Sequence, residues 1–189
     1  DDILLQMCGG FMEKMPIPFD IEQVSSLYPL MYTESMNTVL SQECLRYNKL
    51  VREIRRTLPQ LERAVKGLVV MSGELETMAN ALLVQGVPEL WENKAYPCLK
   101  ALNGWVDELL ERLTFVQKWI DEGTPSVFWI AGFYFPQAFL TGSRQNYARK
   151  TTFPIDEVRT CILCVCVCVC VCVLCVAAAK AFLFLFWMP

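Results

Sequence analysis

The sequence predicts an all-α body followed by an apolar tail of a different character. From residue 33 to residue 122, apolar residues recur at spacings of three and four, the period of an amphipathic helix. Residues 161–175 instead alternate cysteine with other apolar residues, mostly valine, at a period close to two. Proline and glycine punctuate the helical stretches, so we expect five to seven helices in a bundle-like array before residue 156, and an unpacked tail after it.

Residues 1–32 contain short apolar clusters separated by residues that favour turns. Gly9-Gly10 lacks both a following lysine and a preceding strand, so a turn is favoured over a nucleotide site. Pro16-Ile17-Pro18 and Pro29 are further breaks. Asp20 is placed to cap a short helix that reaches Leu27.

The pattern becomes strongly helical at Thr33, and we expect Pro59 to end or restart the first long helix. Its apolar stripe is Met36, Val39, Leu40, Tyr47, Leu50, Val51, Ile54 and Leu58. The charged residues largely occupy the other faces: Glu43, Arg46, Lys49, Arg52, Glu53 and Arg56. A second stretch uses Leu61, Val65, Leu68 and Val69, and Ser72-Gly73 separates it from a helix that ends before Gly86-Val87-Pro88.

Residues 89–97 are expected to form an ordered loop, and residues 99–122 the clearest helix, with Gly123 as its left-handed C-cap. The block Val127–Leu140 is apolar on all sides, so we expect it to be the most deeply buried part of the body. Pro136 can start a helix that runs toward Lys150. Residues 152–156 are expected to be extended.

Composition excludes several classes of function. The 189 residues carry a net charge of −3, which gives no electrostatic reason to expect nucleic acid. No histidine is present, which removes the commonest acid–base group at neutral pH and the commonest metal ligand. Cys8, Cys44 and Cys98 are widely scattered and indicate buried thiols in a reducing compartment. We expect no signal peptide in these residues, and we expect the start to be the cut edge of a longer protein.

No catalytic, cofactor-binding or metal-binding residue is predicted. The sequence has no phosphate-binding Gly-x-x-x-x-Gly-Lys-Ser/Thr loop, and without histidine no Ser–His or Cys–His pair can form. We expect the remaining candidate residues to have structural roles. They are the carboxylate pairs Glu74/Glu76 and Glu108/Glu111 on solvated faces, the packing residues Trp91, Trp105, Trp119 and Trp129, and the basic cluster Arg144, Arg149 and Lys150, a solvated end or a docking edge.

Several blocks of the sequence, taken in order, resemble a known family. The blocks Glu34–Leu50 and Leu61–Glu76 resemble the first long C-terminal helix of dynein heavy chains and the segment that follows it. Residues 1–32 resemble the lid of the sixth AAA module just upstream. The most specific blocks are Val87-Pro-Glu-Leu-Trp91, Tyr96-Pro97, Trp119-Ile-Asp121, Val127–Gly142 and Gln145–Lys150. The amino-acid sequence of these blocks is more similar to axonemal, inner-arm heavy chains than to the cytoplasmic form.

The resemblance implies a piece of an ATP-driven, minus-end-directed microtubule motor of cilia and flagella. It divides the sequence into an AAA-lid-like segment (1–32), the C-terminal helical region (33–156) and a low-complexity tail (157–189). No catalytic residue of the family maps onto these residues, since ATP and Mg²⁺ bind elsewhere in the parent protein. The implied partners are the AAA ring of the same heavy chain and, through the full-length motor, intermediate chains, light chains and microtubules. The implied location is the cytoplasm, cytoskeleton and ciliary axoneme.

The tail departs from the family after Asp156 and allows three interpretations. A helix over Cys161–Ala179 would be about 28 Å long, enough for a membrane anchor on a cytosolic interaction domain. The alternating cysteines suggest a metal–thiolate cluster, although the valine spacers suit a metal cage poorly. A TG dinucleotide repeat read as TGT-GTG encodes Cys-Val, and Glu157-Val158-Arg159 is compatible with a splice-donor-like GAG-GTG-AGG. We favour intron read-through, which makes the tail an aggregation-prone addition without function.

Overall fold

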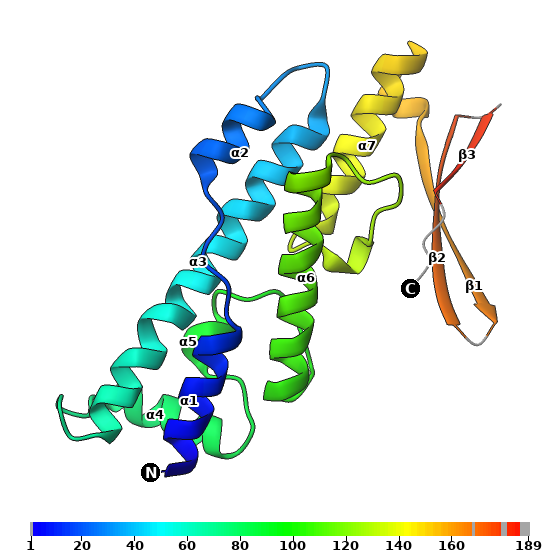
Figure 1. Ribbon diagram of the computed structural model, residues 1–189. Coiled ribbons are helices and arrows are strands. Elements are labelled where there is room, and N and C mark those ends of the chain that lie inside the picture. Colours follow the sequence, from blue (N-terminus) through cyan, green and yellow to red (C-terminus); the bar gives the residue numbers. More distant parts are fainter. Residues whose placement is uncertain (1, 168, 179–180, 186–189) are drawn as a thin grey trace. The chain divides into compact units, whose positions relative to one another are not determined.

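The computed structural model describes residues 2–167, 169–178 and 181–185, with side chains as far as Val158. Every element described before Arg159 is helical, which confirms the predicted all-α class of the body. Figure 1 labels the elements. The helices are α1 (Asp2–Lys14), α2 (Ile21–Leu27), α3 (Ser35–Val65), α4 (Gly73–Leu83), α5 (Glu89–Glu92), α6 (Leu102–Glu122), the 3₁₀ turn η1 (Ile130–Gly132), α7 (Pro136–Thr151) and the 3₁₀ turn η2 (Ile155–Glu157).

The protein divides into two compact units. Unit 1 comprises Asp1–Asp20 and Cys44–Thr114, and unit 2 comprises Ile21–Glu43 and Phe115–Pro189. The long helices α3 and α6 contribute residues to both units. In each unit the apolar stripe of these helices supplies the interior, as the three-and-four spacing predicts. The fully buried residues of unit 1 include Tyr47, Leu50, Ile54, Leu58, Leu61, Leu82, Leu102 and Leu109.

Helix α1 contradicts the predicted turn at Gly9-Gly10, because both glycines lie inside it. Leu4, Cys8 and Phe11 are its buried residues, at spacings of four and three. Burial of that stripe outweighs the roughly 1 kcal/mol that each interior glycine costs relative to alanine. The segment after α1 is fixed to α3 in the same unit, where Arg55 Nη1 donates to the Met15 carbonyl at 2.8 Å.

Helix α3 runs through Pro59, so the predicted end or restart there is wrong. Ile54, Leu58 and Leu61 stay buried on both sides of the proline, and this continuous stripe compensates for the backbone hydrogen bond that proline cannot make. The helix ends at Val65, two residues before Gly67, whose φ is +72°. Leu68 and Val69 therefore lie in an exposed loop instead of extending the buried stripe as predicted.

Most other predicted boundaries agree with the structure. Helix α2 ends at Leu27, and Ser72 caps α4 by accepting from Leu75 N. Gly123 follows α6 with φ +95°, as a left-handed C-cap requires, and α7 begins at Pro136. Leu99 lies outside α6 and is exposed, and residues 155–157 form a 3₁₀ turn where an extended segment was expected.

The block Val127–Leu140 is not the most deeply buried part of the body, contrary to the prediction. Only Gly132, Phe133 and Phe139 of this block are buried, and Val127 and Phe135 are exposed. The segment contains a 3₁₀ turn and loop before α7 begins, so its side chains leave the backbone in several directions. Its buried rings still form an aromatic cluster in unit 2, with Phe133 and Phe139 stacked at 4.6 Å between centroids.

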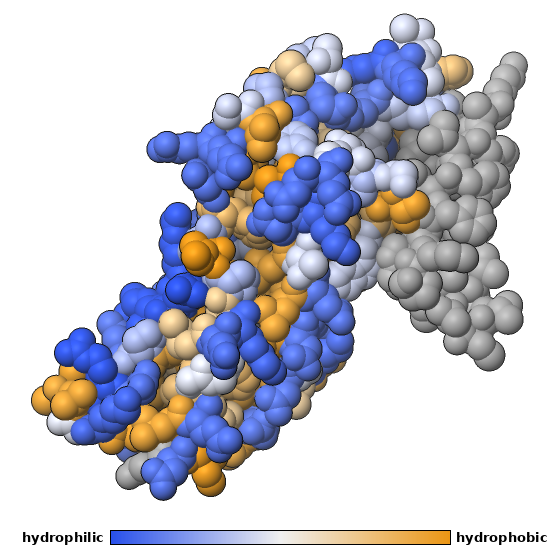
Figure 2. Space-filling model, in the orientation of Figure 1, coloured by the Kyte–Doolittle hydropathy of each residue, from blue (hydrophilic) through white to orange (hydrophobic). Residues whose placement is uncertain are grey.

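The surface of the body mixes charged and apolar residues. Figure 2 shows hydrophilic side chains over much of the visible face, with separate hydrophobic groups between them. Exposed apolar residues include Leu68 and Val70 in the α3–α4 loop. Among the described residues, no helix has the length and apolar character needed to cross a bilayer.

The described residues of the Cys-Val run form strands. β1 (Arg159–Val167), β2 (Val169–Ala178) and β3 (Ala181–Leu185) make an antiparallel sheet in the order β1-β2-β3. The helical form that the anchor interpretation needs is therefore not adopted by the described residues of the run. That the tail lacks tertiary packing with the body stays a prediction.

Candidate functional site

Two irregular segments connect helices of the body. The first connecting segment (residues 84–101) follows α4 and includes α5, and the second connecting segment (residues 123–135) follows α6. The first contains the resembling blocks Val87–Trp91 and Tyr96-Pro97, and the second contains the first part of the block Val127–Gly142. Each is held to α3 by a buried glutamate: Glu53 for the first and Glu43 for the second.

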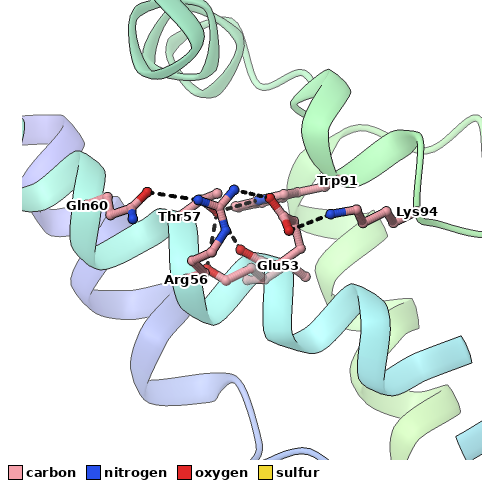
Figure 3. Close-up of polar contacts among 7 residues, drawn as sticks. Glu53, Arg56, Thr57, Gln60, Trp91 and Lys94 are labelled. Carbon is pink, nitrogen blue, oxygen red and sulfur yellow. Dashed lines mark hydrogen bonds and ion pairs between the residues drawn. The ribbon is translucent and has the colours of Figure 1, made fainter. Parts of the chain in front are cut away.

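Glu53 holds the first connecting segment through an ion pair. Its Oε2 lies 2.5 Å from Lys94 Nζ, and its Oε1 accepts a hydrogen bond from Arg56 one helical turn away. Figure 3 shows Glu53 between these two cations, with Arg56 also donating to Gln60 Oε1 at 3.2 Å. The carboxylate is largely buried, whereas the side chains of Lys94 and Arg56 are 46% and 51% exposed. Water therefore competes for both cations.

The hydrogen bond from Arg56 is the main cause that lowers the pKa of the Glu53 carboxyl below its ordinary value, and Lys94 adds to it. Burial acts in the opposite direction and is outweighed. The same pairing raises the pKa of Arg56. Glu53 is consequently a fixed negative charge at neutral pH and is not tuned for proton transfer.

Trp91 anchors the first connecting segment beside this ion pair. Its side chain is fully buried, and its Nε1 donates to Thr57 Oγ1 at 2.9 Å. Thr57 Oγ1 in turn donates to the Glu53 carbonyl at 2.8 Å, so the indole completes a series of hydrogen bonds onto α3 (Figure 3). Trp91 also stacks on Trp105 of α6 at 6.1 Å. The packing role predicted for Trp91 and Trp105 is confirmed.

A second ionic group in unit 1 is centred on Glu108 of α6. Lys100 Nζ lies 2.8 Å from Glu108 Oε2, and Arg112 Nε donates to Oε1 at 2.9 Å. Burial alone would raise the pKa of Glu108, and the hydrogen bonds from Lys100 and Arg112 outweigh it, so the pKa is lowered. The Arg112 guanidinium also lies 3.7 Å from the centre of the Tyr96 ring. The solvated face predicted for Glu108 is therefore wrong, whereas Glu111 is exposed.

The Glu43 side chain holds the backbone of the second connecting segment. The carboxylate is only 1% exposed, and it accepts hydrogen bonds from the backbone N–H groups of Tyr134 and Phe135, the latter at 3.0 Å. These residues directly precede α7, whose first N–H groups have no partner within the helix. A negative charge beside that helix start is also favourable because of the helix dipole. Glu43 thus fixes where α7 begins.

Ser35 at the start of α3 joins this helix to the far end of α7. Its backbone N–H donates to Asn146 Oδ1 at 2.8 Å, and its hydroxyl accepts from Arg149 Nη1 at 2.7 Å. The Arg149 guanidinium lies 4.2 Å from the centre of the Tyr32 ring, while Arg144 Nη2 donates to the Ile155 carbonyl at 3.1 Å. The predicted basic cluster is therefore divided, because two of its members are used internally and Lys150 alone is exposed.

The α3–α7 junction also contains an open groove of about 370 Å³. Its lining is built from hydroxyl, amide and apolar side chains: Ser35, Thr38, Val39, Gln42, Phe135, Gln137, Ala138, Thr141, Gly142 and Gln145. None of these lining residues titrates near neutral pH, so they cannot act as general acids or bases. In the part of the sequence that the structure describes, no group of three or more His, Cys, Asp or Glu is arranged to hold a metal ion.

The scattered cysteines agree in part with the expectation of buried thiols. Cys8 and Cys44 are buried, and Cys98 is half-buried with its Sγ 3.7 Å from Glu108 Oε2. Burial raises the pKa of the Cys8 thiol to about 11. A thiol with so high a pKa is a poor nucleophile at neutral pH.

The buried ionisable groups therefore hold connecting segments in place, which is the character of a structural helical domain. The sequence model of the C-terminal domain of dynein heavy chains matches residues 1–165, and the protein belongs to this family. It is 54% identical over 157 residues to human dynein axonemal heavy chain 3 and 54% identical over 158 residues to rat dynein axonemal heavy chain 1. It is 52% identical over 156 residues to human dynein axonemal heavy chain 12.

These matches cover 82–84% of this sequence but only 4–5% of each relative. The sequence therefore spans only a small part of the length of these relatives. The expected resemblance to dynein heavy chains is confirmed, and all three of these relatives are axonemal heavy chains.

Proposed function

We propose that this protein is the C-terminal region of an axonemal dynein heavy chain and that it has a structural and regulatory role in the motor without catalysing a reaction itself. The identity of about one half to axonemal heavy chains supports the assignment. The use of Glu43, Glu53 and Glu108 as fixed charges that hold connecting segments supports the structural role.

In this proposal the helical region acts on the AAA ring of its own heavy chain, and ATP and Mg²⁺ bind elsewhere in the motor. Intermediate chains, light chains and microtubules are partners of the full-length motor. The corresponding location is the ciliary axoneme within the cytoskeleton. Residues 1–32 belong to the end of the sixth AAA module, residues 33–156 to the C-terminal helical region, and residues 157–189 to the tail.

A domain exchange tests the structural role. The matching segment of an axonemal heavy chain is replaced by residues 1–158 of this protein, and microtubule gliding and microtubule-activated ATP turnover are measured. We expect the hybrid to retain both activities. A matched hybrid with Trp91→Ala should lose them, because the first connecting segment loses its anchor. Equal activity of a heavy chain that lacks this segment altogether would contradict the proposed role.

The isolated protein tests the absence of catalysis. Purified protein mixed with ATP should show no saturable turnover, since the sequence has no phosphate-binding loop. Turnover that co-elutes with the protein and follows its concentration would contradict this. Gel filtration of residues 1–158 separates a motor fragment, which should be poorly soluble, from an autonomous binding module, which should be monodisperse.

We propose further that the tail derives from intron read-through and has no function in the motor. The coding sequence across residues 156–176, compared with the genomic locus, tests this directly. A TG repeat continuous with intronic DNA is the expected result. Varied cysteine and valine codons on a properly spliced exon would contradict it and would restore the membrane-anchor alternative.

A further inference from the structure

The tail sheet leaves one long strand at an edge. In the order β1-β2-β3, β2 is paired on both sides, and among the described residues no strand pairs with the outer side of β1. An edge strand presents a row of backbone N–H and C=O groups that a strand of another molecule can pair with. β1 has nine residues and β3 has five, so β1 offers the longer edge.

β1 also lacks the sequence features that usually block an edge. Natural sheets protect edges with lysine, proline, bulges or very short strands. β1 contains neither lysine nor proline, and its register with β2 is continuous from Arg159↔Ala177 to Val167↔Val169. The sequence has no charged residue from Cys161 to Ala179, so no like charges keep two such runs apart.

The repeat makes many pairings equivalent. In the β1–β2 register, cysteine stands opposite cysteine and valine opposite valine, as in Cys164↔Cys172 and Val165↔Val171. A shift of two residues replaces each residue by one of the same kind through most of the repeat. Register is weakly specified in such a strand, which favours pairing with further molecules.

We propose that β1 is a self-association surface whose partner is β1 of a second copy of this protein, joined antiparallel by backbone hydrogen bonds. Antiparallel pairing about Leu163 places Arg159 of one copy opposite Val167 of the other, so the two arginines stand at opposite ends of the ladder. A second copy fits because it presents the same strand, which contains neither lysine nor proline and is uncharged after Arg159. The joined sheets form one six-stranded sheet and bury both β1 edges.

The test uses the full-length protein in a reducing buffer, which excludes disulfide-linked oligomers. Light scattering coupled to gel filtration should show dimers or larger oligomers whose population rises with concentration. Val165→Lys places a charge in the edge strand and should weaken self-association by about tenfold or more. Leu99→Lys adds the same charge at an exposed position of the body and should leave self-association unchanged.

Hydrogen exchange identifies the surface. The amides of residues 159–167 that do not pair with β2 should exchange more slowly in the oligomer than in the monomer. Circular dichroism should show an unchanged helical body in each variant. A full-length protein that is monomeric at all concentrations would overturn the proposal, because the edge would then be covered by its own body. Oligomers that form only when the reductant is left out, or that Val165→Lys leaves intact, would overturn it as well.

Discussion

The two connecting segments are each fixed by a glutamate of α3, yet the two glutamates have different kinds of partner. Glu43 is buried and accepts from two backbone N–H groups, whereas Glu53 pairs with two half-exposed cations. Water can replace Glu53 as a partner of Lys94 and Arg56, whereas the Glu43 carboxylate that accepts from the two amides is almost fully buried. Buried glutamates of the same helix therefore contribute unequally to stability. The contribution depends on which partner groups lose the glutamate when it is removed.

The largest effect is expected at the tryptophan that anchors the first connecting segment. Trp91→Ala should lower the free energy of unfolding by about 3–5 kcal/mol, because a fully buried indole and its hydrogen bond to Thr57 are lost. Trp129→Ala in the second connecting segment should cost about 1–3 kcal/mol, since that side chain is only half-buried. Urea unfolding of a protein ending at Val158, at a concentration low enough to keep it in solution, measures both. A greater loss for Trp129 would restore the second segment as the most deeply buried part.

The glutamate comparison is tested by matched alanine variants. Glu43→Ala should cost about 2–4 kcal/mol, because the amides of Tyr134 and Phe135 lose this carboxylate as acceptor. Glu53→Ala should cost about 0.5–1.5 kcal/mol, because its two cations turn toward water. Urea unfolding again gives the values, and Glu43→Gln, which keeps one acceptor oxygen, should recover part of the loss. Equal costs for the two alanine variants would remove the distinction between backbone and cation partners.

Acid should weaken unit 1 through Glu53 and Glu108. The pKa of each carboxyl is lower in the folded protein than its ordinary value, so the unfolded protein binds more protons and stability rises with pH. The contribution is complete above the ordinary glutamate pKa of about 4.3 and is lost as pH falls through the lower folded values. Unfolding between about pH 7 and about pH 3 should show this slope. The double variant Glu53→Gln, Glu108→Gln should flatten it, and an unchanged slope would assign the effect to other carboxylates.

The smallest effects are expected at the glycine near the start of each segment. Gly123 has φ +95°, so Gly123→Ala should cost about 1 kcal/mol by forcing an alanine into the left-handed region. Gly86 does not have a positive φ, and an added Cβ would make only ordinary contacts, the nearest at 3.5 Å to the Ala81 carbonyl. Gly86→Ala should therefore be neutral or stabilise by up to about 1 kcal/mol through the unfolded state. Thermal melts compare the two, and an opposite order would contradict the backbone assignment.

Much of the body could be predicted from periodicity and caps alone. The stripes of α3 and α6, the break at Ser72-Gly73 and the left-handed Gly123 follow from local rules that tertiary packing reinforces. Pro59 and Gly9-Gly10 could not be judged locally, because burial of neighbouring apolar residues outweighs their effect on the backbone. Helix propensity is a weak guide where packing is strong.

The roles of the two glutamates were missed, although the sequence contains a signal for them. Glu43 lies three residues after Leu40 and four before Tyr47, and Glu53 lies three after Leu50, so both fall on the apolar stripe of α3. A charged residue on such a stripe must find a partner or be excluded from the interior. The partners themselves could not be predicted, since Lys94 and Phe135 lie far from these glutamates in the sequence.

The buried cysteines of unit 1 provide a measure of motion in the folded protein. Cys8 in α1 and Cys44 in α3 are shielded from solvent, and burial keeps the Cys8 thiol protonated at neutral pH. An alkylating reagent can reach these sulfurs only when the surrounding helices open, so the labelling rate of each cysteine reports the opening of its own helix. Peptide-resolved mass spectrometry separates the two sites from the cysteines of the tail. The labelling rates of these two native thiols therefore measure local unfolding at two positions in unit 1.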